Sequence, residues 1–264
     1  MVTSISPTGL VGRLAERWVR PWWRIVHLSA LVMALALSPS TYRREWRPTL
    51  ARHLVAATLP MLPWFTLLAA LATVVIVRIV LVTALSYGLS QYALEMVVRV
   101  LVLELIPLTA GLFVALRWSI PAGSALAQMR REGALAELRR GGVDVLQAEV
   151  LPRALAGLFA VLMLAAVSGL VALVLAYLLA HGLSPWGLAG YTRMVGQVFS
   201  PAVTVVFVGK TLALALVVAL LPLGSALHDA DAGRGGQGAE LQGLVRLASA
   251  ILLIEVGSLM INYA

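Results

Sequence analysis

Five long apolar runs constrain this chain more than any other feature. The runs cover about 57–82, 94–118, 154–180, 200–223 and 244–263. Each has roughly the 20 residues that an α-helix needs to cross the hydrocarbon core of a bilayer. Of the 264 residues, 61% are hydrophobic and 12% charged. That is about half the charged share of an average soluble protein. The sequence therefore predicts an all-α integral membrane protein, with about five spans in one domain over residues 1–264.

The segment before the first run is rich in arginine and tryptophan, and its apolar part, residues 27–37, is too short to span. Trp and Arg side chains favour the headgroup region, so residues 8–38 are predicted to form an interfacial helix. A cleaved signal peptide is the alternative, because residues 34–38 resemble a cleavage region. A basic segment of more than twenty residues with three tryptophans argues against it.

Basic residues are distributed unevenly between the runs. The N-terminal segment and the connections 119–153 and 224–246 hold nearly all of them, whereas the other two connections and the C-terminal end hold only Arg193. Cytoplasmic segments of membrane proteins carry the excess of Lys and Arg. The sequence thus predicts a cytoplasmic N-terminus and a C-terminus on the outer side of the membrane.

Charge and composition also exclude several functions. The formal net charge is +8, but the basic residues lie in short segments between apolar runs, which indicates membrane orientation rather than nucleic-acid binding. The chain has no cysteine, which rules out disulfides, thiolate metal sites and thiol nucleophiles, and its four histidines are scattered. We therefore expect no metal or cofactor bound by this chain.

The tetrapeptide 208–211 looks like the end of a phosphate-binding loop but lacks the context of one. Thr204 stands where the loop needs a glycine, and the tetrapeptide lies inside an apolar run. The chain is therefore not expected to be an ATP-hydrolysing enzyme.

Charged residues inside the runs are the first candidates for a functional role. Lys210, the only lysine of the chain, lies about 15 Å into the fourth run at 1.5 Å per helical residue. Glu104 and Glu255 reach comparable depths in the second and fifth runs, and Arg117 ends the second run. Because an unpaired ammonium is costly at that depth, Lys210 is predicted to pair with Glu104 or Glu255. Such a pair either fixes helix packing or takes part in transport.

The connection 119–153 contains apolar residues at mostly helical spacing. They are Leu126, Met129, Leu135 and Leu138, with Arg130, Arg131, Glu137, Arg139 and Arg140 available for other faces. These residues alone leave two interpretations open: a helix on anionic headgroups, or a helix that docks on a partner protein.

A series of motifs over residues 104–153 carries a family signal. The motifs are Glu104-Leu105-Ile106-Pro107, then Gly111, Ala115 and Arg117, then Met129-Arg130, Gly142-Val143-Asp144 and Pro152-Arg153. In this order they resemble the permeases of the MlaE type, also called YrbE-like. Residues 182–185 and Gly209-Lys210-Thr211 are similar to the same family.

The resemblance implies a five-span permease of the inner membrane that dimerises on two cytoplasmic ABC ATPase subunits. It also implies a periplasmic MCE-type protein as partner, phospholipid or a related lipid as cargo, and ATP bound only by the ATPase. The connection 119–153 would hold the coupling helix. Its candidate coupling residues are Met129, Arg130, Arg131, Leu135, Leu138, Arg139, Arg140 and Asp144.

The coupling segment also departs from the family pattern. Acidic or amide residues are usual where this chain has Ala125, Gly133, Ala134, Ala136 and Arg139, and Arg140 adds further positive charge. Such a change alters which partner surface is complementary. Three alternatives stay open: a divergent ATPase, the weaker half of a heterodimer, or a scaffold that does not transport. A secondary transporter is less favoured, because no internal repeat is visible.

Overall fold

The computed structural model describes residues 27, 29–38, 47–88, 90–228 and 236–263. Among these residues there is no strand, and five helices are long and apolar enough to cross a membrane. These helices are Pro48–Ser86, Tyr92–Arg131, Leu146–His181, Pro201–Leu227 and Leu241–Asn262. The prediction of an all-α membrane protein with five spans is confirmed.

The first span is interrupted at Pro60. Helix α2 (Arg47–Thr58) ends just before this residue, and α3 (Met61–Ser86) begins just after it. Pro60 and Pro63 lie at the start of α3, where the first N–H groups of a helix have no intrahelical partner, so proline costs little there. The first apolar run, expected from 57, thus starts in the last turn of one helix and continues in another.

The second span is a continuous helix with widened turns. It comprises α4 (Ser90–Val97), the π-helical η2 (Val98–Leu105), α5 (Ile106–Val114), the π-helical η3 (Ala115–Ser119) and α6 (Ile120–Arg131). A third π-helical stretch, η4 (Leu146–Val150), leads into α8 (Leu151–His181). Each of the three ends two residues before a proline, namely Pro107, Pro121 and Pro152. Proline lacks an N–H and its ring crowds the carbonyl four residues earlier, a conflict that a widened turn relieves.

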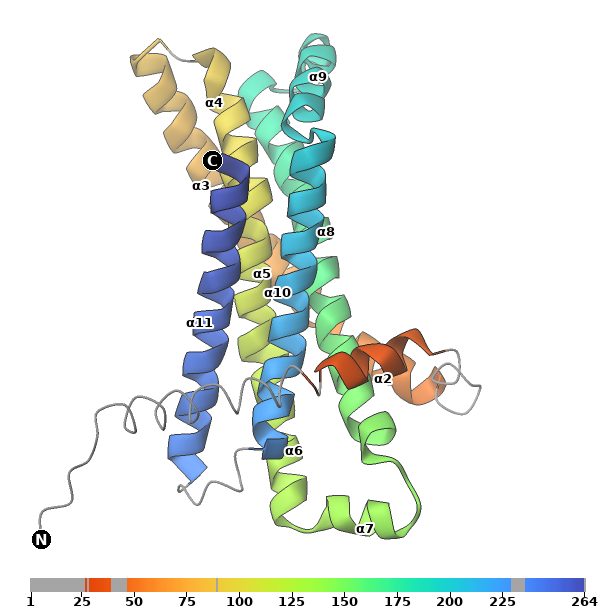
Figure 1. Cartoon of the computed structure of the whole chain (residues 1–264). Helices are drawn as coiled ribbons and strands as arrows, with labels where there is room; N and C mark the ends of the chain where they lie inside the picture. Colours follow the sequence, from red (N-terminus) through yellow and green to blue (C-terminus); the bar gives the residue numbers. More distant parts are fainter. Residues whose placement is uncertain (1–26, 28, 39–46, 89, 229–235, 264) are drawn as a thin grey trace, which may run out of the picture.

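Short helices join the spans at the two ends of the bundle. The remaining elements are α7 (Ala134–Arg140), η5 (Pro185–Gly187), α9 (Leu188–Val198), α10 (Pro201–His228) and α11 (Gly236–Tyr263). Figure 1 shows α7 and the first turns of α11 at the lower end, and the α3–α4 turn and α9 at the upper end. Gly133 and Gly142, with φ of 80° and 78°, provide the left-handed turns on either side of α7.

The short helix α9 is fastened to α8 by Tyr191. Its hydroxyl donates a hydrogen bond to the Leu173 carbonyl at 2.8 Å, and its ring centroid lies 5.3 Å from that of Tyr177. Burial raises the pKa of Tyr191 to about 12, so this hydroxyl stays a neutral donor at physiological pH.

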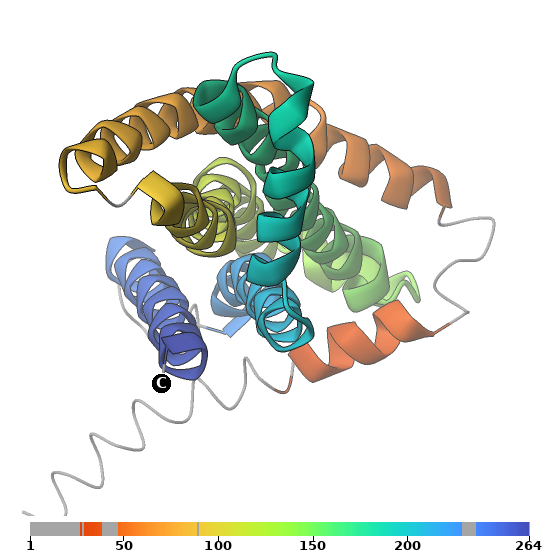
Figure 2. The same ribbon diagram turned by 90° about the horizontal axis from the view of Figure 1, so that it is seen from above.

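Helix α8 forms the centre of the bundle and packs against α2, α3, α5 and α10. Phe65, Leu164 and Leu214 are fully buried in the core between these helices. Viewed from above, α11 lies at the outside of the bundle, and it packs mainly against α10 (Figure 2). This peripheral position matters for Glu255, one of the charged residues that α11 carries.

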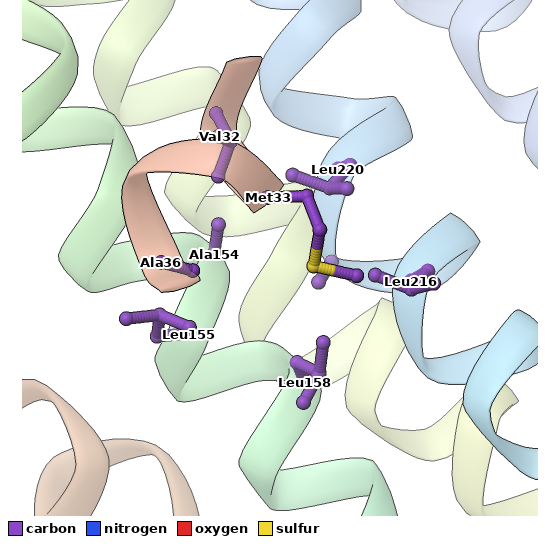
Figure 3. Close-up of a pocket in the computed structure, with 9 residues that line it drawn as sticks. Val32, Met33, Ala36, Ala154, Leu155, Leu158, Leu216 and Leu220 are labelled. Carbon is purple, nitrogen blue, oxygen red and sulfur yellow. The ribbon is translucent and has the colours of Figure 1, made fainter. Parts of the chain in front are cut away.

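The described part of the predicted interfacial helix is its C-terminal end, in which residues 29–37 are helical; residues 8–26 and 28 lie outside the described residues. Val32, Met33 and Ala36 line a small hollow with Leu216 and Leu220 of α10 (Figure 3). The hollow has an apolar lining, completed by Ala154, Leu155, Leu158 and Ala219. It offers no group for binding an ion or a polar headgroup, so we interpret it as a small gap in the side-chain packing between helices.

Candidate functional site

Three charged side chains from three different spans meet inside the bundle. Lys210 of α10 donates hydrogen bonds to Glu104 of η2 and to Glu255 Oε1 of α11, the latter at 2.8 Å. Lys210 is 4% exposed and Glu104 is 8% exposed. The sequence offered the two acids as alternative partners for Lys210, and the structure brings both to it at once.

Asn262 adds an amide to this group, since its Nδ2 lies 3.5 Å from Glu104 Oε1. We call Glu104, Lys210, Glu255 and Asn262 the charge cluster. Sequence reasoning missed Asn262, although Glu255, Ser258 and Asn262 share one face of α11 at positions i, i+3 and i+7. A polar stripe on an otherwise apolar span was the signal that marked it.

Not every polar atom of this region is satisfied. Glu255 Oε2 and Ser258 Oγ are both buried, and neither has a hydrogen-bond partner among the described residues. Burying a polar group in apolar surroundings is costly unless it is hydrogen-bonded. Two carboxylates also face a single ammonium, so the fully ionised cluster carries one excess negative charge.

Other charged residues of the second span lie apart from the charge cluster. Arg117 is exposed on η3, about 20 Å further along the helix than Glu104. Arg99 and Glu95 pair with each other at 3.0 Å and are partly exposed. The sequence analysis named Arg117 together with Glu104, Lys210 and Glu255, but in the structure Arg117 lies apart from these three residues.

The tetrapeptide that resembles a phosphate-binding loop is part of α10. Residues 208–211 are helical, and the ammonium of Lys210 is engaged by carboxylates. No group of three His, Asp or Glu residues in the described part of the chain could hold a metal ion.

A second candidate region is the turn between the second and third spans, formed by α6 and α7. Its apolar stripe faces the core of this chain: Leu126 is fully buried, Leu135 is 6% exposed, and Met129 and Leu138 pack against the same cluster. The stripe therefore holds the turn against the bundle and is not an open surface for a partner.

The exposed side of the turn is charged. It presents Arg131, Arg139 and Arg140 together with Glu132 and Glu137. Asp144 is also exposed, and its Oδ1 accepts the backbone N–H of Leu146 at 2.9 Å. That bond satisfies one of the free N–H groups at the start of η4, which gives Asp144 a structural role in the turn.

The turn is fastened directly to α10. The Arg130 guanidinium donates a hydrogen bond to the carbonyl of Leu227 in the last turn of α10. Nearby, a Cβ on Gly123 would lie 2.9 Å from the carbonyl oxygen of Pro222, so α6 and α10 approach as closely as a glycine permits. Helix α10 also carries Lys210, which connects the turn to the charge cluster through one helix.

Removing the Arg130 bond is expected to weaken this connection. We expect Arg130→Met to lower the free energy of unfolding by about 1.5–3 kcal/mol, the range for a hydrogen bond to a charged group. The measurement is thermal unfolding of the purified protein in detergent. Arg131→Met is the matched control, because Arg131 is exposed, and it should change stability by no more than about 0.5 kcal/mol. Equal losses for the two variants would contradict the assigned contact.

Comparison with protein families matches residues 50–261 of the chain to the model of the permease MlaE. This chain belongs to the MlaE permease family. The match confirms the resemblance seen in residues 104–153 and extends it from α2 through all five spans. It includes Glu104, Lys210 and Glu255 of the charge cluster and the whole α6–α7 turn. A search of curated proteins found no match to the chain. An MlaE permease is the membrane subunit of a transporter and is not an enzyme by itself.

Proposed function

We propose that this chain is the membrane subunit of an ATP-driven ABC transporter that moves phospholipid or a related lipid across the cell envelope. The observation that carries the proposal is the MlaE family match, which covers the five spans and the α6–α7 turn together. In this proposal the permease is a homo- or heterodimer, a separate cytoplasmic ATPase binds and hydrolyses ATP, and a periplasmic MCE-type protein exchanges lipid with the permease.

The distribution of arginines supports an orientation in the inner membrane. The connection at the end of the bundle that holds α7 carries Arg130, Arg131, Arg139 and Arg140, whereas the connections at the opposite end carry Arg193. Because cytoplasmic segments hold the excess of basic residues, we place the α6–α7 turn in the cytoplasm and the C-terminus in the periplasm.

Labelling of single cysteines tests this orientation in a chain that has no cysteine of its own. Ala136 on α7 and Ser184 before η5 are both exposed and lie at opposite ends of the bundle. In intact cells with a permeable outer membrane, an impermeant thiol reagent should label Ser184→Cys and not Ala136→Cys. Both should react after the inner membrane is opened. Labelling of Ala136→Cys alone in intact cells would reverse the orientation.

The α6–α7 turn supplies the surface for the ATPase in this proposal. Its apolar stripe is occupied by the bundle, so docking uses the exposed arginines and glutamates. A basic surface of this kind fits an acidic rim on the ATPase. Movement of the docked turn would reach α10, and with it Lys210, through Arg130 and the close contact at Gly123.

Gentle purification tests the proposed partners and cargo together. The full chain, extracted in mild detergent from its native membrane, should retain an ABC ATPase and an MCE-type protein, and mass spectrometry should find bound phospholipid. The same membranes carried through the procedure without the tagged chain are the control. Recovery of the intact permease with none of these subunits, at several detergent concentrations, would favour the scaffold alternative over a transporter.

A further inference from the structure

We infer that the charge cluster is a proton-binding site and that Glu255 carries the proton. Lys210 is the one cation of the cluster and faces the two carboxylates of Glu104 and Glu255. With all three groups ionised, the cluster has a net charge of −1 among apolar helices. An uncompensated charge within a span is costly, and two carboxylates that share a site do not readily ionise together. A single bound proton makes the cluster neutral.

The contacts of the two acids decide which of them holds the proton. Glu104 contacts the Lys210 ammonium through one oxygen and the Asn262 amide, at 3.5 Å, through the other. Glu255 contacts Lys210 through Oε1, and its Oε2 has no hydrogen-bond partner among the residues that the structure describes. Hydrogen bonds to a carboxylate stabilise its ionised form. Glu104 is therefore the ionised partner of Lys210, and the proton resides on Glu255.

Neighbouring charges do not alter this balance. Glu95 and Arg99 pair at 3.0 Å and compensate each other, while Arg117 lies about 20 Å along the helix from Glu104. Ser258 and Asn262, which share a face of α11 with Glu255, are uncharged, and Asn262 contacts Glu104. In the described part of the chain, Lys210 is thus the one cation in contact with the two buried acids.

The proton has a structural consequence for α11. This helix packs mainly against α10, and the charge cluster is a polar contact that joins it to α10 and η2. A protonated Glu255 attracts Lys210 less strongly than a carboxylate does. Release of the proton would therefore tighten α11 against α10, and uptake would loosen it. This inference stands apart from the proposed ATPase, MCE partner and cargo.

Infrared spectroscopy of the purified chain in lipid nanodiscs at pH 7 tests the inference directly. The wild type should show the C=O stretch of one buried protonated carboxylic acid, displaced in D2O. Glu255→Gln should abolish this band, and so should Glu104→Gln, because either change leaves one carboxylate for one ammonium. Glu95→Gln is the matched control, since it removes a carboxylate outside the cluster, and should leave the band unchanged.

A charge-balanced variant sharpens the test. In Lys210→Met/Glu104→Gln, Glu255 has no cation beside it, so the band should return to its wild-type intensity. The inference is overturned if the wild type has no protonated-acid band at pH 7, or if Glu255→Gln leaves the band intact. A band that disappears when Na⁺ is added to the wild type would also overturn it, because the site would then take a metal cation. Should a cluster variant fail to fold, the wild type and Glu95→Gln still decide whether the proton is present.

Discussion

Replacing Lys210 by methionine is expected to lower the free energy of unfolding by about 3–5 kcal/mol, the range for breaking a buried ion pair by removing one partner. Lys210 is buried, and its ammonium is the one cation that contacts Glu104 among the described residues. Methionine keeps the length and the apolar stem of lysine, so the loss reports the charge and not a cavity. Thermal unfolding in detergent, with the yield of monodisperse protein, measures it.

Rescue by a second substitution identifies the partner that matters. Lys210→Met/Glu104→Gln should regain most of the lost stability, because it removes the ionised partner of Lys210 and leaves Glu255, which is protonated in our inference. Lys210→Met/Glu255→Gln should regain little, because it removes an acid that is already neutral and keeps Glu104, which has lost its cation. Arg99→Met is the control, since its pair with Glu95 is partly exposed and should be worth about 1 kcal/mol or less. Strictly additive losses in both double variants would show that Lys210 is not coupled to either acid.

The second large effect is expected at the α6–α7 turn. Changing Arg139 and Arg140 to glutamate reverses the charge of two exposed residues on α7, so the proposed acidic rim of the ATPase would be repelled. The permease should still insert and fold, because neither side chain belongs to the buried stripe of the turn. We expect the ATPase to be lost on purification, or its stimulation by the permease to fall at least tenfold.

Arg193→Glu provides the matched control for charge reversal. Arg193 is exposed on α9, at the opposite end of the bundle from α7, so this variant should keep the ATPase fully bound. If the double glutamate variant retains its ATPase and full stimulation, α7 is not the coupling element. Loss of the ATPase from both variants would indicate a general effect of charge instead of a docking surface.

Much of the architecture follows from the sequence, because the bilayer imposes a simple rule on chain composition. Runs of about 20 apolar residues mark the spans, since every backbone polar group in the bilayer core must be satisfied within a helix. The buried position of Lys210 could be derived in the same way, because an ammonium at that depth requires an acid. Which acid Lys210 contacts depends on how the spans are arranged, and the structure shows that it contacts both Glu104 and Glu255.

Features that depend on packing between helices were not predictable from spacing. The apolar stripe of the α6–α7 turn has the same pattern whether it faces a partner or its own bundle, and only the structure places Leu126 in the core.

The changes in helix geometry coincide with prolines in the sequence. The break between α2 and α3 lies at Pro60, and the π-helical stretches lie just before Pro107, Pro121 and Pro152. Pro222 lies inside α10 without such a stretch, so a proline in the sequence does not by itself locate these changes in helix geometry.

Lipid transfer by the reconstituted transporter is the most direct test of the proposed function. The permease is placed in liposomes with its co-purified ATPase and the MCE-type protein, and movement of a labelled phospholipid between the membrane and that protein is followed with and without ATP. We expect ATP-dependent transfer that requires this chain, fails with the Arg139→Glu/Arg140→Glu variant and persists with Arg193→Glu. Transfer that proceeds equally without the chain, or an active ATPase with no lipid movement, would contradict it.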